Sequence, residues 1–172
     1  MPRWARSAKV MHFGIEFAGD LQSLRRLFSG EVELNWLDEI GCSPFFYAIH
    51  GKHFDMAKEM LERGADVNFP NRDGWTPLFW AALNGHADVA AFLVTCGADA
   101  NIPAREGDLP LFVAAYKGYP EIVRLLLAAG ARPDAIGPEG RNALWVAQAR
   151  GHAEIVTLLA CFSPTLPTPG YH

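Results

Sequence analysis

Histidines and cysteines are the side chains of this sequence most suited to catalysis or metal binding. His53, His86 and His152 recur at multiples of 33 residues, and such residues could serve as general bases or metal ligands. The cysteines lie far apart and outside any Cys-x-x-Cys or Cys/His ligand spacing: Cys42, Cys96 and Cys161. The sequence also contains no H-E-x-x-H, G-x-S-x-G, Walker-type or dinucleotide-binding motif. We therefore expect no catalytic, metal or cofactor site, and we expect the histidines to brace loops.

Composition and charge narrow the possible partners. The chain has 172 residues, of which 50% are hydrophobic and 20% charged, and its net charge is −4. Nucleic-acid binding depends on clustered Lys and Arg, and no long basic run exists here. There is no stretch of 18 apolar residues, and no apolar region follows the basic start of the chain. With three scattered cysteines, these features predict a soluble cytoplasmic protein without nucleic-acid or membrane partners. A nuclear location and a secreted effector are the open alternatives.

An internal repeat determines which residues occupy equivalent positions in the fold. Gly41, Gly74, Gly107 and Gly140 are each 33 residues apart, and each opens a similar segment, such as GWTPLFWAAL. Other residues keep the same register, namely Ala48, Ala81, Ala114 and Ala147, then Gly64, Gly97 and Gly130, then Asn68, Asn101 and Asp134. One such unit cannot bury its own apolar face, so several must stack to form a continuous core.

Each repeat is predicted to fold as two short antiparallel helices and a turn. Ser43-Pro44 and Thr76-Pro77 place a hydroxyl at the N-cap and proline at the first helical position. A glycine in the left-handed conformation is expected to end this helix at Gly85, Gly118 and Gly151. Apolar residues at i, i+3 and i+4 predict the second helix, as in Ile122, Leu125 and Leu126. Asn68 and Asn101 are expected to brace the turn that follows.

The 33-residue period with G-x-T-P-L, A-A-x-x-G-H and G-A-D-x-N resembles the ankyrin repeat, most closely over GWTPLFWAALNGHADVAAFLVTCGADAN. The resemblance implies an all-α, ankyrin-type α-solenoid of about five helix-turn-helix units joined by extended hairpin loops. It predicts a single repeat domain over residues 10–162, between an N-terminal lead (1–9) and a Pro-rich tail (163–172). The predicted divisions are a capping repeat, 10–40, followed by repeats 41–73, 74–106, 107–139 and 140–162. In this family, asparagines at the turn position can also be oxygenase targets.

Departures from the family pattern are specific to this chain. An aromatic stripe follows T-P-L where histidine is common, at Phe46, Phe79, Phe112 and Trp145. We interpret these rings as packing between repeats; the alternative is a hydrophobic ladder presented to a partner. Lys52 replaces the glycine between helices, which predicts an irregular turn. Leu109 replaces the capping hydroxyl, and Asn142-Ala143 replaces Thr-Pro, which predicts weaker helix starts.

The resemblance implies that a partner binds in a concave groove lined by the inner helices and the loop tips. The inner-helix face is predicted to contain Tyr47, Trp80, Val113 and Val146, with the residues three and four positions further on. Tryptophan and tyrosine are frequent interface hot spots. The predicted partner-binding residues are Tyr47, Trp75, Trp80, Leu83, Asn84, Asp108, Tyr116, Lys117, Arg141 and Arg150.

These observations predict a non-catalytic module, an adaptor or scaffold, that binds another protein. The alternative is a regulatory, inhibitory or self-assembling subunit that acts through the C-terminal repeat. That repeat has the apolar residues Ile155, Leu158 and Leu159, and SPTLPTPGYH follows it instead of a polar capping helix. The tail could fold back, another chain could stack there, or the natural protein could be longer. We expect a monomer, with self-association through this repeat as the open alternative.

Overall fold

The computed structural model describes residues 33–39, 41–137 and 140–162, which contain eight α-helices. The chain divides into two compact units, Met1–Pro77 and Leu78–His172. The all-α fold predicted from the sequence is confirmed. The predicted N-terminal lead, most of the capping repeat (10–32 and residue 40) and the Pro-rich tail lie outside the described residues.

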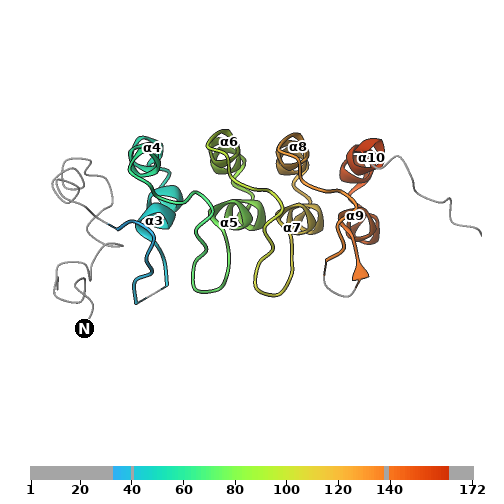
Figure 1. The fold of residues 1–172 in the computed structure, drawn as a ribbon. Helices are drawn as coiled ribbons and strands as arrows, with labels where there is room; N and C mark the ends of the chain where they lie inside the picture. Colours follow the sequence, from blue (N-terminus) through green and yellow to red (C-terminus); the bar gives the residue numbers. More distant parts are fainter. Residues whose placement is uncertain (1–32, 40, 138–139, 163–172) are drawn as a thin grey trace, which may run out of the picture. The chain divides into compact units, whose positions relative to one another are not determined.

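The helices form pairs of one inner and one outer helix (Figure 1). The first unit contains α3 (Pro44–His50) and α4 (Phe54–Glu62). The second contains α5 (Pro77–Asn84), α6 (Ala87–Thr95), α7 (Pro110–Lys117), α8 (Pro120–Ala128), α9 (Ala143–Arg150) and α10 (Ala153–Phe162), with α5 beginning at the boundary between the units.

In the first unit, α3 packs against α4 around Phe45, Ile49 and Met60, whose side chains are fully buried. The start of α3 follows from its sequence. Ser43 Oγ accepts a hydrogen bond from the Phe46 amide at 3.1 Å, and Pro44 occupies the first turn. The hydroxyl cap predicted at this position is therefore confirmed.

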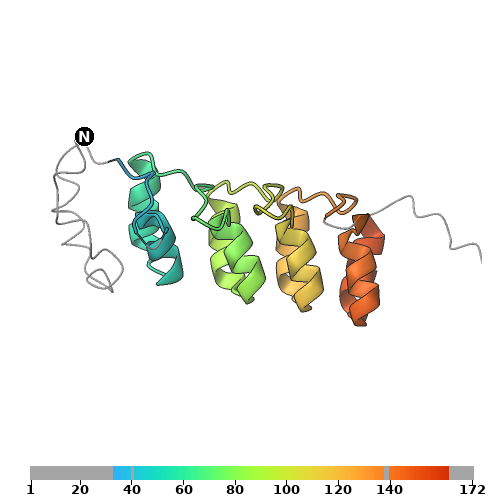
Figure 2. The same cartoon turned by 90° about the horizontal axis from the view of Figure 1, so that it is seen from below.

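The second unit has two rows of helices. Figures 1 and 2 show α5, α7 and α9 side by side in an inner row and α6, α8 and α10 in an outer row. Helix α7 packs against α8 and α9, and α8 packs against α6 and α10. Ala114 and Ala147, which have no exposed surface, allow the inner helices to approach closely. Large side chains fill the space between the rows, among them Ile122, Leu126, Ile155 and Leu159.

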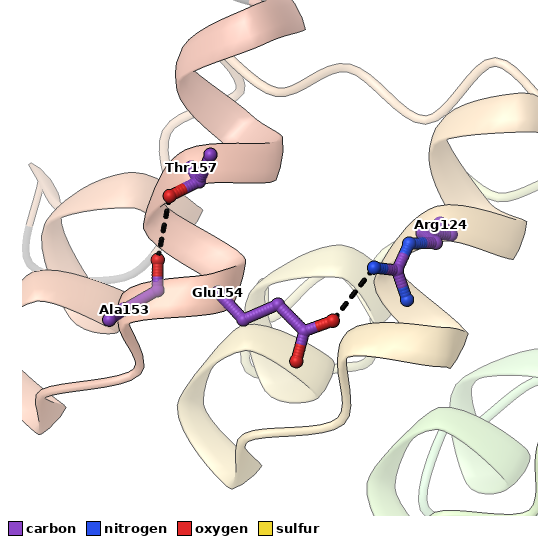
Figure 3. Close-up of polar contacts among 4 residues, drawn as sticks. All are labelled: Arg124, Ala153, Glu154 and Thr157. Carbon is purple, nitrogen blue, oxygen red and sulfur yellow. Dashed lines mark hydrogen bonds and ion pairs between the residues drawn. The ribbon is translucent and has the colours of Figure 1, made fainter.

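Polar contacts on the outer row are exposed. Arg124 of α8 forms an ion pair with Glu154 of α10 at 2.7 Å, and the Thr157 hydroxyl donates to the Ala153 carbonyl at 3.0 Å (Figure 3). An exposed pair of this kind contributes at most about 1 kcal/mol. Apolar burial between the helices is therefore the main source of stability.

Asparagine side chains connect the turns of successive repeats. The Asn101 amide donates to the Gly130 carbonyl at 3.0 Å, and its oxygen accepts from the Arg132 N–H at 3.0 Å. Asn35 makes the equivalent pair of bonds in the first unit, to Gly64 and Asp66. The predicted bracing role is thus confirmed for Asn101, and it operates between repeats as well as within one turn.

The substituted caps behave differently from one another. Leu109 provides no side-chain cap for α7, as predicted. The weaker start predicted for α9 is wrong in this respect, because Asn142 Oδ1 accepts from the Trp145 amide at 2.8 Å. Asparagine is as good an N-cap as serine, so this replacement keeps the bond.

Glycines in the left-handed conformation end the inner helices, and at two of them the side-chain ring of a residue in the next repeat packs against the glycine. Gly85, Gly118 and Gly151 all have positive φ, as predicted, and Lys52 takes the same region at φ 56°. The His152 ring lies so close to Gly118 that an added Cβ would be 2.6 Å from its Cε1 atom; Tyr119 lies similarly against Gly85. At Gly151, by contrast, no neighbouring atom lies within 4 Å of the position that an added Cβ would occupy.

This difference predicts unequal effects of two matched substitutions. Gly151→Ala should cost about 1 kcal/mol, because alanine is strained at positive φ. Gly118→Ala should cost at least about 1 kcal/mol more, because the His152 ring must also move. Urea unfolding followed by circular dichroism would measure both, and equal losses would contradict the close contact.

Candidate functional site

Tyr47, in the first unit, is bound to its own loop. Its hydroxyl donates to Asp38 Oδ2 at 2.7 Å, and Asp38 Oδ1 accepts from the amides of Gly41 and Cys42 at 2.8 and 2.9 Å. Burial and the Asp38 carboxylate raise the pKa of Tyr47 well above its usual value. The phenol therefore remains protonated and braces the loop that precedes α3.

Trp75 occupies a loop tip that Asn71 closes. Asn71 Oδ1 accepts from the amides of Asp73 and Trp75 at 3.0 and 2.9 Å, and the Asn71 amide donates to the Trp75 carbonyl at 3.0 Å. The side chain of Trp75 is half-buried. Its backbone thus shapes the tip, while part of the indole remains accessible.

Three predicted residues lie on α5, at the start of the second unit. The Trp80 ring centroid is 5.0 Å from that of His86, and the Asn84 side-chain amide donates to the Trp80 carbonyl at 2.8 Å. Trp80 and Leu83 are half-buried, whereas Asn84 is exposed. The α5 contribution to an accessible surface is therefore modest.

The most exposed predicted residues meet where α7 and α9 end. The Arg150 guanidinium lies 4.2 Å from the centroid of the Tyr116 ring, and this ring is 40% exposed. Lys117, next to Tyr116, is also exposed. His152 holds the junction, because its Nε2 lies within hydrogen-bonding distance of the Tyr116 carbonyl oxygen, at 3.2 Å. A cationic and aromatic surface results at this end of the two helices.

A second pair of the same kind occurs where α9 begins. The Arg141 guanidinium lies 4.4 Å from the centroid of the Trp145 ring, and Trp145 is 46% exposed. We call Tyr116, Lys117, Arg141, Trp145 and Arg150 the α7–α9 surface. A guanidinium over an aromatic face is stabilised by the ring quadrupole and still presents N–H donors at its edge.

The aromatic stripe is only partly core. Phe46 and Phe79 are buried, as the packing interpretation predicted, and Phe112 is half-buried against Gly137 in the loop before α9. For Trp145 the interpretation is wrong, since this ring is exposed. Trp145 was missed as a candidate site residue because its register partners are core residues.

The predicted accessible face of the inner helices is wrong at two of its residues in the later repeats. Val113 and Val146, expected to line that face, are 8% and 4% exposed. The residues three and four positions further on are exposed, as that face required: Tyr116, Lys117, Ala149 and Arg150. Ile136, which is 61% exposed in the loop before α9, was missed as well; its signal is an isoleucine where earlier repeats have Pro70 and Pro103.

Asp108 lies in the loop before α7, where its backbone carbonyl accepts from the Ala104 amide at 2.8 Å. Burial and the neighbouring Glu106 carboxylate raise the pKa of Asp108 above its ordinary value of 3.8. The Asp108 carboxyl therefore loses its proton less readily in the folded chain than in the unfolded chain. Asp108 lies one repeat before Arg141, so the loop tips of these repeats differ in charge.

Cysteine thiols and clustered metal-binding side chains are the groups of the described residues best suited to chemistry. Burial and nearby carboxylates raise the pKa of the Cys42 thiol, which is the opposite of what an activated nucleophile requires. Within residues 33–39, 41–137 and 140–162, no three His, Cys, Asp or Glu side chains are grouped so that they could hold a metal ion. None of the helices in these ranges has both the length and the apolar character needed to cross a membrane.

Comparison with known families gives one match. A family model described as ankyrin repeats (3 copies) matches residues 11–104 and 93–166. Comparison with curated proteins gives no match. The family match covers every described repeat, including the α7–α9 surface.

The raised pKa of Asp108 predicts a pH-dependent effect of removing its charge. A carboxyl that binds its proton more tightly when folded lowers stability as the pH rises above about 4. Asp108→Asn should therefore raise the urea midpoint at pH 7, and the gain should shrink as the pH falls toward 3. Glu106→Gln, which removes the repelling charge, should give a smaller gain. A loss of stability in Asp108→Asn at pH 7 would contradict this account of Asp108.

Proposed function

The chain belongs to the ankyrin-repeat family, whose members are generally protein–protein interaction modules, and we propose that it is a non-catalytic adaptor or scaffold. It binds a protein partner through the inner helices and loop tips of its repeats. Binding is strongest at the α7–α9 surface. Trp80, Leu83, Asn84 and Asp108 contribute at its margin, and Tyr47 and Trp75 contribute from the first unit.

Exposed aromatic rings under guanidinium groups are the observation that carries this proposal. Tyr116 and Trp145 are 40% and 46% exposed on neighbouring inner helices. The Arg150 guanidinium lies over the Tyr116 ring, and the Arg141 guanidinium lies over the Trp145 ring. Tryptophan, tyrosine and arginine dominate the binding energy of protein interfaces, because each offers a large contact area together with hydrogen-bonding groups.

A non-catalytic role in a reducing, cytoplasmic-type compartment is part of the proposal. Cys42, Cys96 and Cys161 form no disulfide, and Cys161 is exposed. Proteins kept in an oxidising compartment commonly pair such residues in disulfides. The raised pKa of Cys42 further supports a binding role over nucleophilic chemistry.

Removing the two exposed rings should abolish binding. We expect Tyr116→Ala/Trp145→Ala to lose a partner captured from a lysate of source cells by the wild-type chain, with at least about 2 kcal/mol of binding energy lost. Capture would be measured by affinity purification and mass spectrometry.

The control is Arg124→Ala/Thr157→Ala, which alters exposed outer-row residues and should leave capture unchanged. Urea unfolding would show that both variants fold. A partner retained by Tyr116→Ala/Trp145→Ala would refute this assignment of the surface.

A second candidate function, self-assembly through the C-terminal repeat, is favoured by one observation. Phe162, at the end of α10, is 54% exposed, and Cys161 beside it is exposed as well. Apolar surface of this kind at a terminal repeat can stack on another chain. Such a subunit would act by assembling with itself or by covering an enzyme.

Light scattering under reducing conditions tests this alternative. If α10 mediates assembly, the mass of the wild-type chain should rise with concentration, and Phe162→Asp should keep it at that of one chain. Reductant removes any contribution from a Cys161 disulfide. A constant single-chain mass for the wild type up to millimolar concentration would exclude self-assembly.

A further inference from the structure

The charges of the described helices are segregated between the two rows. Each outer helix has an acidic residue in its first turn, namely Asp55, Asp88, Glu121 and Glu154. The inner helices α3, α5, α7 and α9 contain no acidic residue. Although the chain has a net charge of −4, the inner row of the second unit therefore presents only positive side-chain charges, on Lys117 and Arg150.

Two cations of this surface, Lys117 and Arg150, differ in their partners from three arginines elsewhere in the described residues. Arg63, Arg124 and Arg132 each lie within 4.0 Å of a carboxylate. Neither Lys117 nor Arg150 has a carboxylate partner among the described residues, and Arg150 instead covers Tyr116. The donors of Arg150 at the edge of the ring are thus positioned for a carboxylate from another molecule.

Helix stabilisation accounts for only some of these cations. Lys117 and Arg150 complement the negative ends of their helices, where positive charge is favoured. Arg141 precedes α9, where the helix dipole disfavours a cation. Its position over Trp145 therefore indicates a role other than stabilising α9.

We propose that the α7–α9 surface binds an extended acidic segment of a protein partner. This rests on the proposed function and specifies its ligand. Arg141 precedes the N-cap Asn142, and the eight residues of α9, which ends at Arg150, rise by about 12 Å at 1.5 Å per residue. An extended peptide covers that distance in about four residues. The segment therefore has two carboxylates about four residues apart, with apolar side chains between them that contact Tyr116 and Trp145.

A peptide suits this surface better than a nucleic acid does. Tight nucleic-acid binding relies on many phosphate contacts, and the surface has only three cations. Glu106 is exposed and Asp108 half-buried in the loop before α7, and these carboxylates would repel a continuous polyanion. A short segment with two acidic residues can avoid them.

Fluorescence anisotropy of the full chain with a labelled ten-residue peptide tests the proposal. The peptide has two glutamates four residues apart and leucine between them; its counterpart has glutamines. We expect the glutamate peptide to bind at least tenfold more tightly than its counterpart, and more weakly as salt is added. Arg141→Gln/Arg150→Gln should lower its affinity tenfold or more, whereas Arg124→Gln should not.

Stability must be separated from recognition in this experiment. Arg150→Lys keeps the charge at the end of α9 but lacks the planar fork that binds a carboxylate. It should therefore fold like the wild type and bind the glutamate peptide several-fold more weakly. Urea midpoints would be measured for every variant.

Three results would overturn the proposal: equal affinity for both peptides, no loss of binding in Arg141→Gln/Arg150→Gln, or tighter binding of a 20-nucleotide single strand than of the glutamate peptide. The two proposals fail with different signatures. A natural partner that is retained in Tyr116→Ala/Trp145→Ala refutes the proposed function itself. If the natural partner is lost in Tyr116→Ala/Trp145→Ala but retained in Arg141→Gln/Arg150→Gln, the binding surface stands and its acidic ligand is excluded.

Discussion

The contact between Gly118 and the His152 ring fixes how closely two repeats of the second unit approach. Gly118 ends α7 in a left-handed conformation, and its lack of a Cβ leaves room for a ring from the next repeat. The same ring lies within hydrogen-bonding distance of the Tyr116 carbonyl oxygen. Arg150, two residues before His152, is thereby brought over the Tyr116 ring. The binding surface we propose is thus a consequence of the contact that stacks the repeats.

The separation of structural and accessible side chains follows from the two rows of helices. Alanines and large aliphatic residues form the core, and the asparagines that connect the turns bind backbone groups of the next repeat. The exposed ends of the inner helices do not pack in this core, so they can vary in chemical type. In α7 and α9 they carry exposed rings and cations, and the cations would be costly to bury in a core.

Much of the fold could be predicted from the sequence because the repeat imposes the same local solution several times. The Ser43 cap, the left-handed glycines and the Asn101 bonds all follow from residue types at fixed spacing. The accessible face was harder to predict, since α7 and α9 are apolar on more than one side and a one-residue shift exchanges Val146 for Trp145. Burial of a stripe residue depends on the loop that follows, as Gly137 covers Phe112. Sequence spacing alone does not show which stripe residue lacks a loop that packs over its ring.

The most direct test of the central claim is to map binding on the chain itself. In a ¹⁵N-labelled chain titrated with the diglutamate peptide, the Trp145 indole N–H and the amides around Lys117 and Arg150 should shift and saturate together. The Trp145 signal can be assigned with a Trp145→Phe variant. Amides of α8 and α10 that face away from the inner row should not move. Shifts confined to α8 and α10, or no saturable shifts, would contradict the account.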